Sequence, residues 1–236
     1  LAMTLEFDRI QALLFDIDGT LSDTDDHMVS RLVRLLKPFN FFFKGKDPYS
    51  FARWLVMTVE SPANLLYSLP DRLGLDVHLA RLFDWTAKRQ LTRKHPSDLF
   101  MLVEGVGEML DSLHGHYPMA VVSARNEATT RLFLQHFDLE RYFKVVVTSQ
   151  TCRHTKPFPD PILYAAQQLG VASAACLMIG DTSVDVHAAL AAGAQSLSVL
   201  CGLGREKELR WAGTQLILQS TAEVGELLLK KGLQNN

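Results

Sequence analysis

The sequence predicts an α/β protein in which a doubly wound parallel sheet is interrupted near its start by an all-helical insertion. Short apolar runs bounded by turn residues recur along the chain, and helical segments separate most of them. Strands separated by helices of this length favour right-handed βαβ units and a parallel sheet. The exception is residues 22–97, which show helical spacing of apolar residues and no clear strand.

The first strand is expected at 12–15, where an apolar run precedes two aspartates and a glycine. A run this short is typical of a buried strand of a parallel sheet. Asp16 and Asp18 come at its carboxyl end, where open α/β sheets bind ligands, and Gly19 indicates a sharp turn. Two carboxylates at a buried strand end need a cation or other partners to neutralise them. This stretch is therefore a candidate site.

The insertion, residues 22–97, is expected to form a helical cap, and residues 1–21 and 98–236 are expected to form the α/β core. Apolar spacing predicts four helices in the insertion, at 27–37, from 47, from 62 and at 76–91. The three phenylalanines at 41–43 are interpreted as packing between helices.

Beyond the insertion, predicted helices and strands alternate. Helices are expected at 105–114, 127–136, 161–169, 184–192, 205–211 and 222–229. Strands are expected at 119–122, 145–148, 176–179, 195–200 and 216–218, in the same sheet as the first strand.

The composition excludes several classes of partner. Of the 236 residues, 47% are hydrophobic and 21% are charged, and the net charge of -2 gives no reason to expect nucleic acid or an anionic membrane as partner. No apolar run approaches the roughly 18 residues of a membrane-spanning helix, and the charged residues among the first ten are untypical of a signal peptide. The three cysteines form no CxxC pair, which argues against a disulfide framework or a zinc site. We expect a soluble, cytoplasmic protein.

Ser123 directly follows the expected strand at 119–122, with Ala124, Arg125 and Asn126 after it. This order places a hydroxyl and a guanidinium just after a strand, and Arg125 is close enough to Ser123 to face the mouth of a site there. The alternatives are that Ser123 or Asn126 caps the next helix and that Arg125 lies on the surface.

Lys156 lies in a loop that contains three prolines, at 155–161. Rigid flanks would hold its ammonium at a fixed point, which is a suitable way to present a positive charge. Asp160 and Pro161 are interpreted as the N-cap and the first residue of the next helix, which gives Asp160 a structural role.

A second pair of carboxylates follows the expected strand at 176–179. Asp181 comes after Gly180, and Asp185 stands at the start of a helix. Carboxylates at loop tips suit a hard divalent cation such as Mg²⁺. Either residue alone could instead be an acid that the helix dipole favours, an explanation that suits one aspartate better than two. The glycines at 202 and 204 lack the third glycine of a dinucleotide fingerprint and are interpreted as a turn.

Four of these features together resemble the motifs of the haloacid dehalogenase superfamily of phosphotransferases. They are DIDGT at 16–20, Ser123 after two valines, Lys156 in TKPFPD, and GDTSVD at 180–185. The resemblance covers the whole chain, and it points to the phosphoglycolate phosphatase-like subfamily, whose helical C1-type cap follows the first motif. It implies the same fold, with the motifs at the ends of the strands.

The resemblance also implies catalytic roles. Asp16 would be the nucleophile that forms an aspartyl-phosphate, and Asp18 would be first the general acid and then the base. Ser123, Ala124 and Lys156 would hold the phosphoryl oxygens.

The implied cofactor is Mg²⁺. It would bind the Asp16 carboxylate, the backbone carbonyl of Asp18 and Asp181, with Asp185 binding directly or through water. Arg125 is added as a further contact to the substrate.

The implied activity is Mg²⁺-dependent hydrolysis of a small phosphorylated metabolite, such as phosphoglycolate or a sugar phosphate, with the cap selecting the leaving group. A phosphomutase, an inorganic pyrophosphatase and a non-catalytic binding protein of the same fold are the alternatives. The second aspartate of DIDGT argues against the dehalogenase branch, and the Gly-Thr after it differs from the DKTG loop of transport ATPases.

Overall fold

The structure, a computed structural model, describes residues 4–23 and 100–234. The helices predicted for the insertion, and the phenylalanines at 41–43, lie outside these residues. The chain divides into two compact units, one made of Leu1–Ser22 with Phe100–Asn236 and the other of Asp23–Leu99. The boundaries of the predicted cap and its role in substrate selection stay predictions.

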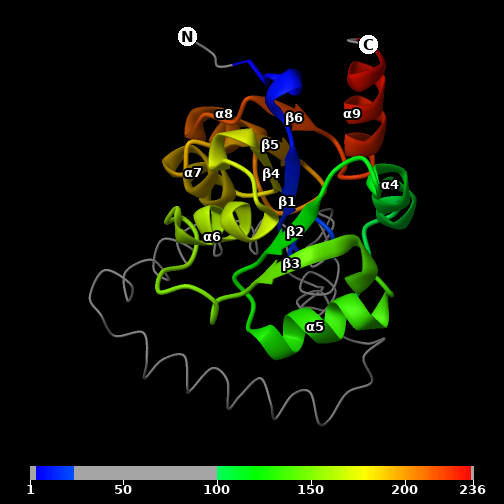
Figure 1. The fold of residues 1–236 in the computed structure, drawn as a ribbon, viewed down its shortest axis with the longest axis vertical. Coiled ribbons are helices and arrows are strands. Elements are labelled where there is room, and N and C mark those ends of the chain that lie inside the picture. The colour runs from blue at the N-terminus through cyan, green and yellow to red at the C-terminus, as the bar shows by residue number, and fades with distance from the viewer. Residues whose placement is uncertain (1–3, 24–99, 235–236) are drawn as a thin grey trace, which may run out of the picture. The chain divides into compact units, whose positions relative to one another are not determined.

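Six parallel strands form one sheet in the order β3-β2-β1-β4-β5-β6 (Figure 1). The strands are β1 (Ala12–Phe15), β2 (Met119–Val122), β3 (Phe143–Val147), β4 (Cys176–Gly180), β5 (Gln195–Val199) and β6 (Leu216–Leu218). From β1 the chain adds β2 and β3 on one side and then β4 to β6 on the other. The order therefore reverses at β1 and β4, and the carboxyl ends of strands at such a point form a crevice that binds ligands. The predicted doubly wound sheet is confirmed.

Helices cover both faces of the sheet. Figure 1 shows α6, α7 and α8 on one side of it and α4 and α9 on the other. The helices are α4 (Val106–Leu113), α5 (Glu127–His136), α6 (Asp160–Leu169), α7 (Ser183–Ala191), α8 (Glu206–Ala212) and α9 (Glu223–Gln234). Short 3-10 segments lie at η1 (Phe7–Arg9), η4 (Glu140–Tyr142) and η5 (Ser173–Ala175). None of the helices in the described ranges is long and apolar enough to cross a membrane.

The core at the centre of the sheet is made of buried apolar side chains. All four side chains of β1 are fully buried, and Leu14 belongs to a cluster that includes Met178 of β4 and alanines of α6 and α7. Small side chains on these two helices let them approach the sheet closely. Burial of a leucine or methionine of this kind contributes about 1.5–3 kcal/mol. This packing gives the strand ends a rigid base.

Most element boundaries lie within one residue of the sequence-based prediction; the larger differences are the start of β3 and the end of α9, which extends to Gln234 instead of residue 229. Strand β3 begins two residues earlier than predicted, at Phe143, because it is an edge strand whose exposed Lys144 hides the apolar pattern. Helix α6 begins at Asp160, so the predicted N-cap role of Asp160 is wrong, and Pro159 takes the N-cap position. The Asp160 carboxylate instead lies 3.0 Å from Nδ1 of His154.

Candidate active site

The register of the sheet places three of the predicted site residues at neighbouring strand ends. Phe15 of β1 pairs with Val121 of β2 on one side and with Ile179 of β4 on the other. Asp16 follows Phe15, and the hydroxyl of Ser123 and the carboxylate of Asp181 follow the two neighbouring strands. The predicted convergence at the carboxyl edge is therefore observed.

Lys156 lies between two carboxylates. Its Nζ is 2.8 Å from Oδ1 of Asp16 and donates a 2.6 Å hydrogen bond to Oδ1 of Asp185. All three side chains are less than one-tenth exposed. Lys156 comes from the loop before α6, and its peptide bond to Pro157 is cis. The loop thus presents a fixed positive charge to the strand ends.

Asp185 has two functions in the structure. It stands in the first turn of α7, where its Oδ2 accepts hydrogen bonds from the backbone N–H of Thr182 at 3.1 Å and from the Thr182 hydroxyl at 2.7 Å. This is the carboxylate half of a capping box, which satisfies backbone donors at the helix start. Its other oxygen accepts from Lys156. The structural interpretation of this residue is therefore confirmed, and its part in metal binding stays a prediction.

Three buried carboxylates and one ammonium lie close together among the described residues. Asp16, Asp181 and Asp185 are all buried, each with a carboxylate oxygen within 4.8 Å of the others, and Lys156 contributes one positive charge among them. Burial raises the pKa of Asp16 to about 7; Lys156 opposes this shift, whereas Asp185 and Asp18 add to it. Burial alone would lower the pKa of Lys156, but Asp16 and Asp185 outweigh it and raise that pKa.

This donor set fits a divalent cation. Buried carboxylates that share one ammonium retain excess negative charge, and a hard cation with oxygen ligands relieves it. Asp16 and Asp181 would hold the ion directly. Both oxygens of Asp185 already accept hydrogen bonds, which suits it to holding Lys156 and supporting the ion through water.

Residues 202 and 203, which the sequence indicated only as a turn, contact Asp181. The backbone N–H of Leu203 donates a 2.9 Å hydrogen bond to Oδ2 of Asp181. A Cβ added to Gly202 would lie 2.1 Å from that oxygen, and one added to Gly19, where φ is +71°, would lie 2.3 Å from it. Only glycine permits such an approach at these positions. The spacing of Gly202 from Asp181 gave no sign of this contact.

Ser123 is buried at the end of β2, and Ala124 next to it is exposed. The Ser123 hydroxyl accepts a 3.1 Å hydrogen bond from the backbone N–H of Arg125. Asn126 is the N-cap of α5, and its side chain accepts from the N–H of Thr129 at 2.9 Å. The capping alternative thus holds for Asn126, and the roles of Ser123 and Ala124 in binding phosphate stay predictions.

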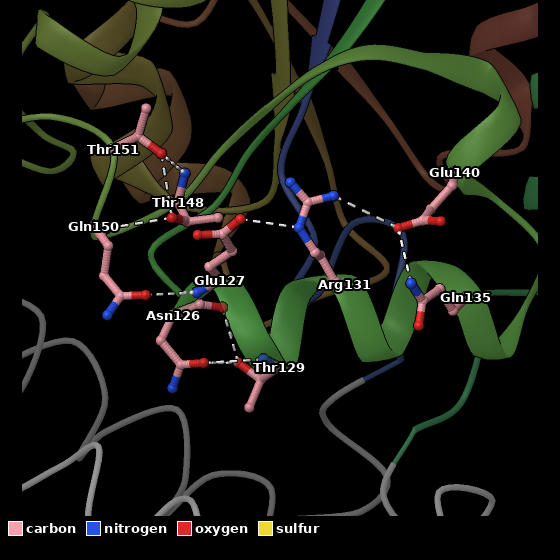
Figure 2. Close-up of polar contacts among 9 residues, drawn as sticks. All are labelled: Asn126, Glu127, Thr129, Arg131, Gln135, Glu140, Thr148, Gln150 and Thr151. Carbon is pink, nitrogen blue, oxygen red and sulfur yellow. Dashed lines mark hydrogen bonds and ion pairs between the residues drawn. The ribbon is translucent and has the colours of Figure 1, made fainter.

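A hydrogen bond joins the start of α5 to the loop after β3 (Figure 2). Oε1 of Gln150 accepts from the N–H of Glu127 at 3.0 Å, and Gln150 is tied by its own N–H to the Thr148 hydroxyl. The backbone N–H of Ser149 donates to the carbonyl of Arg125 at 2.9 Å. These contacts fix the backbone that carries Arg125.

Arg125 forms a bidentate ion pair with Asp18. Its Nε donates to Oδ2 of Asp18 at 2.7 Å, and its Nη2 donates to Oδ1 at 2.5 Å. Asp16 therefore pairs with Lys156, whereas Asp18 pairs with Arg125. The predicted contact of Arg125 with substrate stays a prediction.

The fold and this carboxylate site define a hydrolase of the haloacid dehalogenase type. The model of the family "Haloacid dehalogenase-like hydrolase" matches residues 13–199, and the chain belongs to that family. The chain is thus an enzyme, and the interpretation as a non-catalytic protein is not supported.

Three curated relatives bear the name of a phosphatase or a pyrophosphatase. The chain is 28% identical over 213 residues to the "Probable phosphatase IndB" of Dickeya dadantii, covering 90% of each chain. It is 27% identical to the "Fructose-1-phosphate phosphatase YqaB" of Escherichia coli, covering 82% of this chain and 98% of that one. It is 28% identical to the "Pyrophosphatase PpaX" of Bacillus cereus, covering 81% and 83%. The crystal structure of a "predicted phosphatase" from Clostridium acetobutylicum superposes with a TM-score of 0.66 at 25% identity, covering 94% and 99%.

Proposed function

We propose that this enzyme is a Mg²⁺-dependent phosphatase that hydrolyses a small phosphomonoester through an aspartyl-phosphate on Asp16. The observation that carries the proposal is the position of Lys156, 2.8 Å from Asp16 and within the carboxylate cluster. A buried carboxylate held beside a fixed ammonium at a strand end is suited to attack on a phosphoryl group whose charge needs compensation.

In the first step, an Asp16 oxygen forms a bond to phosphorus while the ester P–O bond breaks. The departing oxygen takes a proton from Asp18, which is the general acid. Ser123 and Lys156 bind the phosphoryl oxygens, where negative charge is spread in the transition state. The Asp18 side chain is 41% exposed, so the leaving group and water can reach it.

In the second step, Asp18 accepts a proton from water, and the water oxygen attacks phosphorus. The bond from phosphorus to Asp16 breaks, which releases inorganic phosphate and restores the carboxylate. When bound by Asp16 and Asp181, Mg²⁺ would supply the positive charge that brings the anionic phosphoryl group and the anionic nucleophile together.

The substrate class that we propose is a sugar phosphate or a similar small phosphomonoester, because two relatives bear the names of phosphatases and one of these names specifies fructose 1-phosphate. Inorganic pyrophosphate is the second candidate, because of the relative named as a pyrophosphatase. We expect the cap, residues 22–97, to select between them.

The test is phosphate release from fructose 1-phosphate, phosphoglycolate, other sugar phosphates and pyrophosphate, with Mg²⁺ and with EDTA. We expect turnover only with Mg²⁺, loss of turnover in Asp16→Asn, and unchanged turnover in Asp138→Asn. Asp138 is a matched control because it is 80% exposed and its backbone φ of 54° suits asparagine as well.

Turnover in Asp16→Asn equal to that of the unchanged protein would refute the mechanism. Conversion of a sugar phosphate to its isomer without net phosphate release would identify a phosphomutase instead. The highest kcat/KM in the panel identifies the substrate class.

A further inference from the structure

Arg125 and Asp18, which are 107 residues apart in the chain, form a bidentate ion pair outside the carboxylate cluster. Two parallel N–H···O bonds, at 2.7 and 2.5 Å, join the guanidinium to both carboxylate oxygens. A fork of this kind fixes the plane of the carboxylate as well as its distance, which a single ammonium does not.

The guanidinium itself is held by two aromatic rings. Its carbon lies 5.3 Å from the centre of the Phe100 ring and 5.4 Å from that of Phe133, and the two rings contact each other edge to face. Both phenylalanines are buried, and the Arg125 side chain is 15% exposed. Partly desolvated cation–π contacts are favourable, and here they restrict where the guanidinium can lie.

The backbone of Arg125 is fixed as well. Its N–H donates to the hydroxyl of Ser123, its carbonyl accepts from Ser149, and Asn126 after it caps α5 (Figure 2). Among the described residues, Nη1 of Arg125 is buried and has no hydrogen-bond partner. The guanidinium therefore makes its hydrogen bonds there through the two nitrogens that face Asp18. The end of β2, the loop after β3 and the start of α5 thus together hold the backbone of Arg125.

We propose that Arg125 is a positioning residue for Asp18: the adjacent rings of Phe100 and Phe133 set the position of the guanidinium, and the guanidinium sets the orientation of the general acid and base. This inference rests on the proposed function, which gives Asp18 that role. The fork holds both carboxylate oxygens of Asp18, and in the proposed mechanism Asp18 gives a proton to the leaving oxygen and later accepts one from water. Arg125 then acts through Asp18 and not through direct contact with substrate.

The test is a double-mutant cycle with Arg125→Gln and Asp18→Asn, and kcat/KM is measured on two substrates. One is the alkyl phosphate with the highest kcat/KM in the panel above, and the other is p-nitrophenyl phosphate, whose leaving group needs little protonation. We expect Arg125→Gln to lower kcat/KM for the alkyl phosphate by about 10- to 100-fold, as for other displaced catalytic groups. We expect a loss of less than about threefold on p-nitrophenyl phosphate.

In the Asp18→Asn background, Arg125→Gln is expected to cause no further loss, because the residue through which it acts is already impaired. Arg125→Lys keeps the charge and loses the fork, so it should show an intermediate loss, and it serves as the second variant if Arg125→Gln unfolds. Arg131→Gln is the matched control, since Arg131 lies on α5 and is half exposed, with Glu127 as its partner. Arg131→Gln should leave kcat/KM unchanged on both substrates.

Two results would overturn this inference and leave the proposed function standing. One is that Arg125→Gln lowers kcat/KM equally on both substrates, and the other is that the fold-losses in kcat/KM of Arg125→Gln and Asp18→Asn multiply in the double variant. Either result, with an active wild-type enzyme, would mean that Arg125 contacts the substrate directly or only supports the fold. A wild-type protein that turns over none of the phosphomonoesters would refute the proposed function and this inference with it.

Discussion

Lys156 donates a hydrogen bond to Asp185 at 2.6 Å, between two side chains that are 4% and 2% exposed. The same ammonium is 2.8 Å from Asp16, so one cation compensates two buried carboxylates, one after β1 and one in the first turn of α7. A buried pair of this kind is costly to break, because the group left behind stays buried and uncompensated.

We therefore expect Lys156→Met to destabilise the metal-free protein by about 3–5 kcal/mol, in addition to abolishing turnover. Urea unfolding in EDTA measures the free energy. Lys144→Met, at an exposed position of β3, is the control and should change the free energy by less than about 0.5 kcal/mol. Combining Lys156→Met with Asp185→Asn should cost less than the sum of the two single changes, because they share one interaction. Additive costs would contradict the pairing.

Mg²⁺ should stabilise the folded protein. Binding to the native state alone contributes about 2.7 kcal/mol at a concentration 100 times the Kd. Thermal unfolding with increasing Mg²⁺ measures this effect, and Asp181→Asn should reduce it strongly because Asp181 is one of the two proposed direct ligands. Asp111→Asn, with a side chain that is 67% exposed, should leave it intact. Equal Mg²⁺-dependent shifts in the two variants would place the ion elsewhere.

Gly202→Ala should impair the metal site without altering any titratable residue. The added Cβ would lie 2.1 Å from Oδ2 of Asp181 and 2.5 Å from the carbonyl oxygen of Gly19, so either the carboxylate or the loop must move. We expect a loss of about 1–3 kcal/mol in stability and a weaker response to Mg²⁺. Gly107→Ala in α4 is the control, since nothing lies within 4 Å of its Cβ position, and it should stabilise the protein by about 0.5–1 kcal/mol. An unchanged Mg²⁺ response in Gly202→Ala would show that the loop adapts freely.

Thr182→Val tests the support of Asp185. The change removes the 2.7 Å hydrogen bond from the hydroxyl and leaves the one from the backbone N–H. A hydrogen bond to a charged group contributes about 1.5–3 kcal/mol, so a loss of that order is expected in urea unfolding. Thr182→Ser retains the hydroxyl and should restore most of the stability. If serine and valine behave alike, the hydroxyl contributes nothing and the effect comes from packing.

The sequence alone determined the fold class and most of the elements, because burial and turn formation are recorded locally. The bounds of α5 match the prediction at both ends, and the glycine after Asp18 has the positive φ that a sharp turn requires. The prediction that Asp16, Asp18 and Asp181 lie at one edge of the sheet followed from the rule that parallel strands share their carboxyl ends, and the family resemblance implied that Lys156 joins them. Where an element lies at an edge, as with Lys144 in β3, the local pattern weakens and the boundary shifts.

The tertiary structure decided which group lies beside each charged side chain. Arg125 with Asp18, and Leu203 with Asp181, are contacts between segments far apart in the chain, and nothing in the residues near either partner specifies the other. The partner of Asp160 was also not predicted from nearby residues. Its carboxylate lies beside His154, whereas the sequence indicated that it caps the start of the helix. Apolar periodicity records which side chains are buried, whereas the partner of a buried charge depends on strand order and register, which only the assembled sheet fixes.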